Sequence, residues 1–90
     1  MPQAIVDPEE LRRFAQSLKR FNNELNQNAT ILSNQLASLS QSWRDQENKK
    51  FSDEFQQNMK AVSRFIDANA EHIPYLLRKA QLIEEYLNER

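Results

Sequence analysis

The sequence predicts an all-α protein in which two long helices, at about residues 8–40 and 45–88, fold back on each other as an antiparallel hairpin. Three observations support this fold class. Apolar residues recur at helical spacing through both halves of the chain, glycine is absent, and there are only three prolines. A β-rich fold would need glycine or proline at frequent turns. We therefore expect residues 1–90 to form one helical-hairpin domain that dimerises into a four-helix bundle.

The first helix has a clear predicted start at residues 7–10. Asp7 is a good N-cap, Pro8 suits the first helical position, and Glu10 adds negative charge at the positive end of the helix dipole. Leucine then recurs every seven residues, and other apolar residues flank that stripe. The apolar positions are Leu11, Phe14, Leu18, Phe21, Leu25, Ala29, Leu32, Leu36 and Leu39.

The second helix is predicted from a pattern that begins at Phe51. Its steps of three and four residues are typical of an amphipathic helix. The members of the pattern are Phe51, Phe55, Met59, Val62, Ile66, Asn69, Ile73, Leu76, Ala80, Ile83 and Leu87. Pro74 lies inside this helix and cannot donate a hydrogen bond to the carbonyl of Ala70, so we expect a kink or a local break there.

The two apolar patterns mirror each other about residues 43 and 44. Facing residues of an antiparallel hairpin have numbers with a constant sum, and this sum is 87 for Leu36 with Phe51 and for Leu25 with Val62. The same register places Asn69 opposite Leu18. The predicted core of the hairpin and its dimer comprises Leu11, Phe14, Leu18, Phe21, Leu25, Leu32, Leu36, Phe55, Met59, Val62, Ile66, Ile73 and Leu76.

A dimer is expected because two helices alone leave much of each apolar stripe in contact with water. A second hairpin would cover the stripes and give an antiparallel four-helix bundle with shallow, coiled-coil-like crossing angles. Each buried Leu or Phe contributes roughly 1.5–3 kcal/mol, which outweighs a surface ion pair. We expect a homodimer, and a heterodimer with a related hairpin is the alternative.

Composition argues against several classes of function. The net charge is -1 and no basic stripe is visible, so nucleic acid is not an expected partner. There is no cysteine and His72 is the only histidine, so we predict no metal site, no cofactor and no catalytic constellation. No apolar run approaches the roughly 18 residues of a membrane span, and residues 1–14 lack the pattern of a cleavable signal peptide. The expected function is non-enzymatic protein–protein interaction.

Asparagine is frequent in the first helix although it is a poor helix former. A solvated polar face is one explanation. The other is that Asn28 or Asn69 lies near the seam between the helices and sets their register or the choice of partner, as a buried asparagine does in coiled coils.

At the midpoint of the chain, Trp43 is followed two positions later by Asp45 and eight positions later by Phe51. This stretch resembles the signature of the WxG family of type VII secretion substrates. Members of that family carry Trp-x-Gly in the turn between two helices and an aromatic or other apolar residue about eight positions after the tryptophan. Here Trp43 and Phe51 have that spacing, and Asp45 occupies the glycine position. Aspartate is a good N-cap and tolerates turn conformations, so a capped turn can replace a glycine turn.

The resemblance implies a helical-hairpin dimer that a membrane ATPase exports without a cleaved signal. The family's Tyr-x-x-x-Asp/Glu export motif is not matched, because Lys79 follows Tyr75 and Arg90 follows Tyr86 at that spacing. Either a partner supplies the motif, or the chain stays in the cytoplasm as a helical adaptor or chaperone-like module. Trp43 either only packs the turn or also presents a surface to the partner or the secretion machinery.

Overall fold

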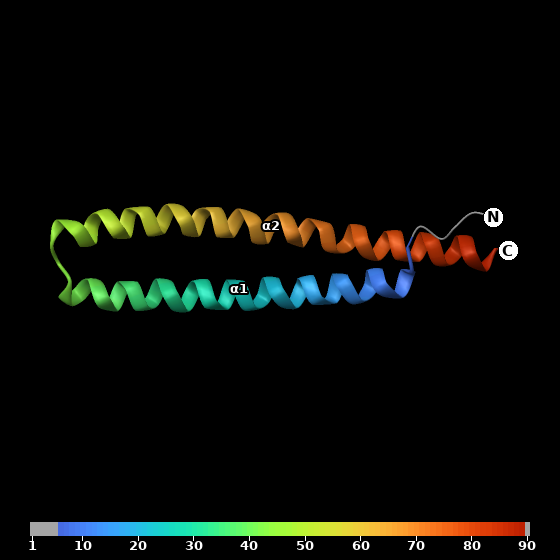
Figure 1. The fold of residues 1–90 in the computed structure, drawn as a ribbon, viewed down its shortest axis with the longest axis horizontal. Helices are drawn as coiled ribbons and strands as arrows, with labels where there is room; N and C mark the ends of the chain where they lie inside the picture. Colours follow the sequence, from blue (N-terminus) through green and yellow to red (C-terminus); the bar gives the residue numbers. More distant parts are fainter. Residues whose placement is uncertain (1–5, 90) are drawn as a thin grey trace.

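The computed structural model describes residues 6–89, which form two antiparallel helices, α1 (Pro8–Ser42) and α2 (Gln46–Asn88), joined by residues 43–45 (Figure 1). The helices lie side by side and make a rod of 68 × 16 × 15 Å. The predicted all-α antiparallel hairpin is confirmed. At the open end of the hairpin, α2 extends past the start of α1 (Figure 1).

Both helices begin at an aspartate whose side chain caps the first turn. The Oδ1 atom of Asp7 accepts a hydrogen bond from the backbone N–H of Glu9 at 2.9 Å, and Pro8 follows at the first helical position. The Oδ1 atom of Asp45 accepts from the N–H of Asn48 at 3.1 Å. These bonds satisfy amides that have no partner inside the helix, so each helix start is encoded locally.

Helix α2 continues through Pro74 without interruption, so the expected alternative of a local break is wrong. Proline removes one backbone hydrogen bond, but the turns on either side of it carry side chains that pack towards α1. Ile73 and Leu76 are both half-buried. Packing on both sides of the proline keeps the two parts of α2 in one helix.

The seam between the helices is only partly shielded from water. Among residues 6–89, no large side chain is fully buried, and the most buried apolar residues are Ala15 and Ala80, which are 1% and 0% exposed. Both lie in the half of the rod where the hairpin opens. Small residues are fully covered there because neighbouring side chains reach across them.

Cross-helix contacts give the register directly. The residue numbers of Ser40 and Asn48, which are hydrogen-bonded near the turn, add to 88, close to the predicted 87. Asn22 and Asn69 add to 91, and the ion pair of Arg12 with Glu84 at the open end adds to 96. The Phe21–Phe65 ring contact and the Asn22–Ile66 hydrogen bond in the middle of the rod give 86 and 88, so the apolar pattern predicted the register well there too, and the Asn22–Asn69 and Arg12–Glu84 pairs depart from it.

Candidate functional site

The turn between the helices needs no glycine. Trp43 ends α1 with φ -96° and ψ 97°, and Asp45 begins α2 with φ -88° and ψ -178°. No described residue has a positive φ, so a residue with a side chain fits every position of the turn. The N–H of Trp43 donates to the carbonyl of Leu39 at 2.9 Å, and Arg44 Nε donates to the carbonyl of Gln41 at 2.6 Å. These bonds satisfy carbonyls at the end of α1.

Trp43 opens a short row of aromatic rings that runs from the turn into α2. Its ring lies 5.9 Å from that of Phe51, and Phe51 is stacked 6.1 Å from Phe55. Trp43 and Phe55 are half-buried, whereas Phe51 remains 46% exposed. The tryptophan thus packs the tip of the hairpin while the ring row stays open to water on one side.

The other predicted site residues follow the seam. Ten of the predicted core residues are half-buried, namely Leu11, Leu18, Leu25, Leu36, Phe55, Met59, Val62, Ile66, Ile73 and Leu76. Phe14, Phe21 and Leu32 are exposed in the single hairpin, by 59%, 47% and 49% of their surface. The structure therefore divides the predicted core into residues that α1 and α2 share and residues that face water.

The exposed part of the predicted core gathers on one side of the rod. In an α-helix, residues 7 and 11 positions apart lie on the same side, which aligns Phe14, Phe21, Leu32 and Leu39 along α1. Phe65 of α2 lies edge-to-face against Phe21, with ring centroids 6.2 Å apart, and Phe51 is two heptads before Phe65. We call these six residues, Phe14, Phe21, Leu32, Leu39, Phe51 and Phe65, the apolar face. All six are more than 45% exposed.

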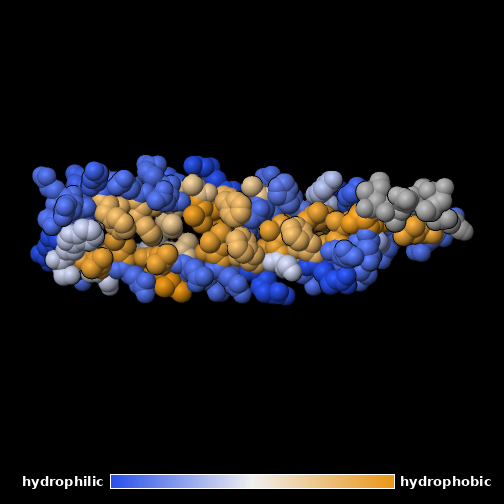
Figure 2. All heavy atoms as spheres, in the orientation of Figure 1, coloured by the Kyte–Doolittle hydropathy of each residue, from blue (hydrophilic) through white to orange (hydrophobic). Residues whose placement is uncertain are grey.

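The space-filling view supports this division. A nearly continuous stripe of hydrophobic side chains runs along the rod in Figure 2, bordered on both sides by hydrophilic ones. A single hairpin has nothing to cover this stripe. Exposed apolar patches of this extent are uncommon on soluble monomers and indicate an interaction surface.

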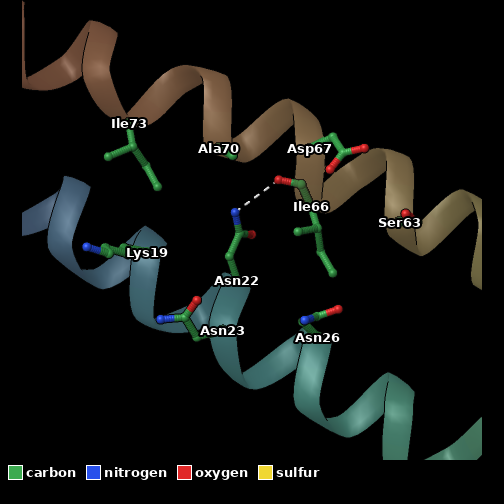
Figure 3. A pocket seen from close by; sticks show the side chains of 9 residues that line it. All are labelled: Lys19, Asn22, Asn23, Asn26, Ser63, Ile66, Asp67, Ala70 and Ile73. Atoms are coloured by element: carbon green, nitrogen blue, oxygen red, sulfur yellow. Dashed lines mark hydrogen bonds between the residues drawn. The ribbon is translucent and has the colours of Figure 1, made fainter.

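The opposite side of the rod is grooved, and both polar and apolar side chains line it. A residue two positions from Phe21 points about 200° away from it, so Lys19 and Asn23 lie on the opposite flank of α1. They line a groove of about 460 Å³ together with Ser63 and Asp67 of α2 (Figure 3). A second groove of about 260 Å³ follows towards the turn, with Asn26, Thr30, Ser33, Asn34 and Ser63 among its lining residues. The two faces of the hairpin therefore differ in chemistry.

Asn22 is a seam residue that the sequence analysis did not single out. It is 6% exposed, and its Nδ2 donates to the carbonyl of Ile66 at 3.0 Å (Figure 3). Its Oδ1 accepts from Asn69 Nδ2 at 3.1 Å. One explanation of the asparagines placed Asn28 or Asn69 near the seam. Asn69 is half-buried, in agreement with that explanation, whereas Asn28 is exposed. The spacing of Asn22, four residues after Leu18 and three before Leu25, is the sequence signal that could have identified it as a seam residue.

An ion-pair network joins the two helices at the open end. The guanidinium of Arg12 donates to both carboxylate oxygens of Glu84, at 2.7 and 2.6 Å, and to Glu9 at 2.7 Å. Hydrogen bonding to Arg12 lowers the pKa of the Glu84 carboxyl, and the same bonds raise the pKa of Arg12. Because these groups are solvent-accessible, the network aligns the helix ends more than it stabilises the fold.

Catalytic and metal chemistry find little support in the described part of the chain. No group of three or more His, Cys, Asp or Glu side chains in residues 6–89 is arranged to hold a metal ion. His72 is exposed. Within the same residues, neither helix has a stretch apolar and long enough to span a bilayer. What the structure offers instead is a surface, the apolar face.

These features define a class of small helical hairpins with a tryptophan in the turn and one uncovered apolar face. The sequence model of the WXG100 family, described as proteins of 100 residues with WXG, matches residues 3–86. The chain therefore belongs to the WXG100 family. No curated protein and no solved structure gives a match.

Family membership sets the general type of function. WXG100 proteins are non-enzymatic, small helical proteins of the type VII secretion substrate kind, and they typically dimerise. The departure of this chain from the family signature is confined to Asp45 in the glycine position. The structure gives the physical reason that this departure is tolerated, which is the N-cap on α2.

The cap gives a direct prediction for the signature position. Replacing Asp45 by alanine removes the bond to the N–H of Asn48 and should cost about 1 kcal/mol of stability, or roughly 4–8 °C in the unfolding midpoint. Asp45→Gly, which restores the family residue, should cost only a few tenths of a kcal/mol. The measurement is thermal unfolding followed by circular dichroism.

Asp53→Ala is the matched control, because Asp53 is an exposed aspartate within α2 rather than at its start. It should leave the midpoint nearly unchanged. An Asp45→Ala variant as stable as Asp53→Ala would contradict the capping account.

Proposed function

We propose that this protein is a type VII secretion substrate, or the dimer partner of one, and that it acts as a homodimer formed through the apolar face. The observation that carries the proposal is the row of exposed Phe and Leu side chains on one side of a WXG100 hairpin. Its action is recognition rather than chemistry. The secretion ATPase is the expected cellular partner.

The energetics favour association. Fully burying a Leu or Phe gains roughly 1.5–3 kcal/mol, so a half-exposed one gains roughly half of that when a partner covers it. Twelve such side chains, six from each hairpin, gain roughly 9–18 kcal/mol, against an association cost of about 4–15 kcal/mol. With a net charge of -1 per chain, two copies repel each other little.

The proposed partner approaches from the apolar side only. The opposite flank carries Lys19, Asn23 and Asp67 beside the apolar residues Ile66 and Ile73, so covering it would desolvate charged and polar groups that the apolar face lacks. Packing two hairpins by their apolar faces gives the antiparallel four-helix bundle with the grooved flank of each hairpin on an outer surface.

A second candidate function, that of a cytoplasmic adaptor or chaperone-like dimer, is suggested by the C-terminal part of α2. Tyr75 and Tyr86 are both exposed, but the residues four positions on are Lys79 and Arg90 rather than an acid. A cytoplasmic adaptor or chaperone-like dimer would need no export motif. The alternative within the leading proposal is a heterodimer, in which a related hairpin that bears the motif pairs through the same apolar face and the two are exported together.

Dimerisation through the apolar face is tested by Phe21→Ser with Phe65→Ser. The pair loses its edge-to-face contact and two apolar groups per protomer, so the dimer dissociation constant should rise by at least about a hundredfold. Light scattering should give twice 10.7 kDa for the unaltered chain and a lower mass for the variant at the same concentration.

The control is Ile31→Ser with Leu82→Ser. These residues are 52% and 59% exposed but lie about a quarter-turn away from the apolar face on their helices. They should leave the dimer intact. Dissociation of the control variant to the same extent would show that the choice of face is wrong.

Export is tested by the amount of the protein in culture supernatant with and without the secretion ATPase. The proposal predicts export that depends on the ATPase. Export that also requires coexpression of a hairpin bearing the export motif would favour the heterodimer over the homodimer. Trp43→Ala separates packing from recognition, because a stable variant that is no longer exported identifies the tryptophan as a recognition residue. Retention of the unaltered protein in the cytoplasm under all these conditions favours the adaptor.

A further inference from the structure

The middle of the seam contains one polar layer between Leu18 and Leu25. Asn22 is 6% exposed, and both ends of its amide are engaged by α2, the Nδ2 by the Ile66 carbonyl at 3.0 Å and the Oδ1 by Asn69 at 3.1 Å. Figure 3 shows the Asn22 side chain crossing from α1 towards α2. Among the described residues, Asn22 is the only buried polar side chain.

Stability alone does not account for this layer. Two apolar side chains of similar size in the same place would be at least as favourable, whereas removing only Asn69 leaves the buried Oδ1 of Asn22 without its donor, and removing only Asn22 leaves the half-buried Asn69 without its acceptor. A hydrogen-bonded polar pair differs from an apolar pair in another way. It tolerates one relative position of the helices, since a shift leaves its donors and acceptors unmatched.

The rest of the hairpin constrains that position weakly. Apolar residues recur every three or four positions along both helices, so a pairing shifted by one turn also brings apolar residues together. The last turn of α1, residues 38–42, contains three serines, which are weaker helix formers than alanine or leucine. This turn can unwind to lengthen the connection, which permits α1 to move along α2 by one helical turn, about 5.4 Å.

We infer that Asn22 and Asn69 are a positioning pair that fixes the register of α1 on α2. Phe21 precedes Asn22, and Phe65 precedes the residue whose carbonyl Asn22 binds, so the same layer brings the two rings level on the apolar face. A shift of one turn separates the amide of Asn22 from that of Asn69 and separates Phe21 from Phe65. Because a backbone carbonyl recurs in every turn of α2, the contact with Asn69 is the one that selects the register. This role lies within one chain and is independent of export and of the partner's identity.

The test replaces the pair by leucine in the full chain. The variants are Asn22→Leu, Asn69→Leu and the double variant, and Asn26→Leu is the matched control because Asn26 is an exposed asparagine one turn along the same helix. The chain has no cysteine, so spin labels can be placed at Ser17→Cys on α1 and Gln57→Cys on α2. Both positions are exposed, and dilution with unlabelled chain isolates the distance within one hairpin.

The inference predicts one narrow distance for the unaltered chain and for Asn26→Leu. The double variant should unfold at the same or a higher temperature, yet show a second distance or a clearly broadened one, displaced by a few Å. Each single variant should unfold at a lower temperature than the unaltered chain. A double variant that keeps one equally narrow distance overturns the inference, and so do single variants as stable as Asn26→Leu.

Discussion

Two helices packed side by side can shield from water only the residues along their shared seam, and the rest of the structure depends on this limit. In the hairpin, alanines are the most fully buried apolar residues, while the leucines and phenylalanines around them are half-covered or exposed. Conformational entropy opposes the ordering of every residue, so a core this thin gives a small margin of stability. The apolar face is the part of the hydrophobic surface that two helices leave uncovered, and covering it by a second hairpin is the simplest remedy.

The same geometry explains why the protein offers surfaces rather than a pocket for chemistry. A two-helix layer has no enclosed interior in which burial could shift the pKa of a base or exclude water from a reaction. Among residues 6–89, the one ion-pair cluster, Arg12 with Glu9 and Glu84, is solvent-accessible and joins the helix ends. Specificity must therefore come from the shape and polarity of the two faces, which lie on opposite flanks of each helix.

Much of the fold could be predicted because its signals are local. Asp7 and Asp45 lie at the two helix starts, and the mirror symmetry of the apolar pattern predicts the hairpin and the register near the turn. Pro74 could not be resolved from local rules, since its effect depends on the packing of Ile73 and Leu76 against α1.

The division of the apolar residues into half-buried seam residues and the exposed apolar face could be determined only from the structure. Phe21 and Leu25 both belong to the apolar pattern, but only the rotation of α1 about its own axis decides that Phe21 faces water while Leu25 is half-buried. Asn22 was missed for a related reason. A polar residue in an apolar stripe is ordinarily read as solvated, and its hydrogen bonds to a carbonyl and an amide 44 and 47 residues away have no signal in the local sequence.

The central claim, that the hairpin depends on a second copy to cover its apolar face, is tested most directly by thermal unfolding at chain concentrations that span a hundredfold. Folding coupled to dimerisation makes the unfolding midpoint depend on concentration. The account predicts a midpoint that rises steadily as the concentration increases. A midpoint that stays constant across the whole range would contradict it, because a hairpin stable by itself has no need of the partner.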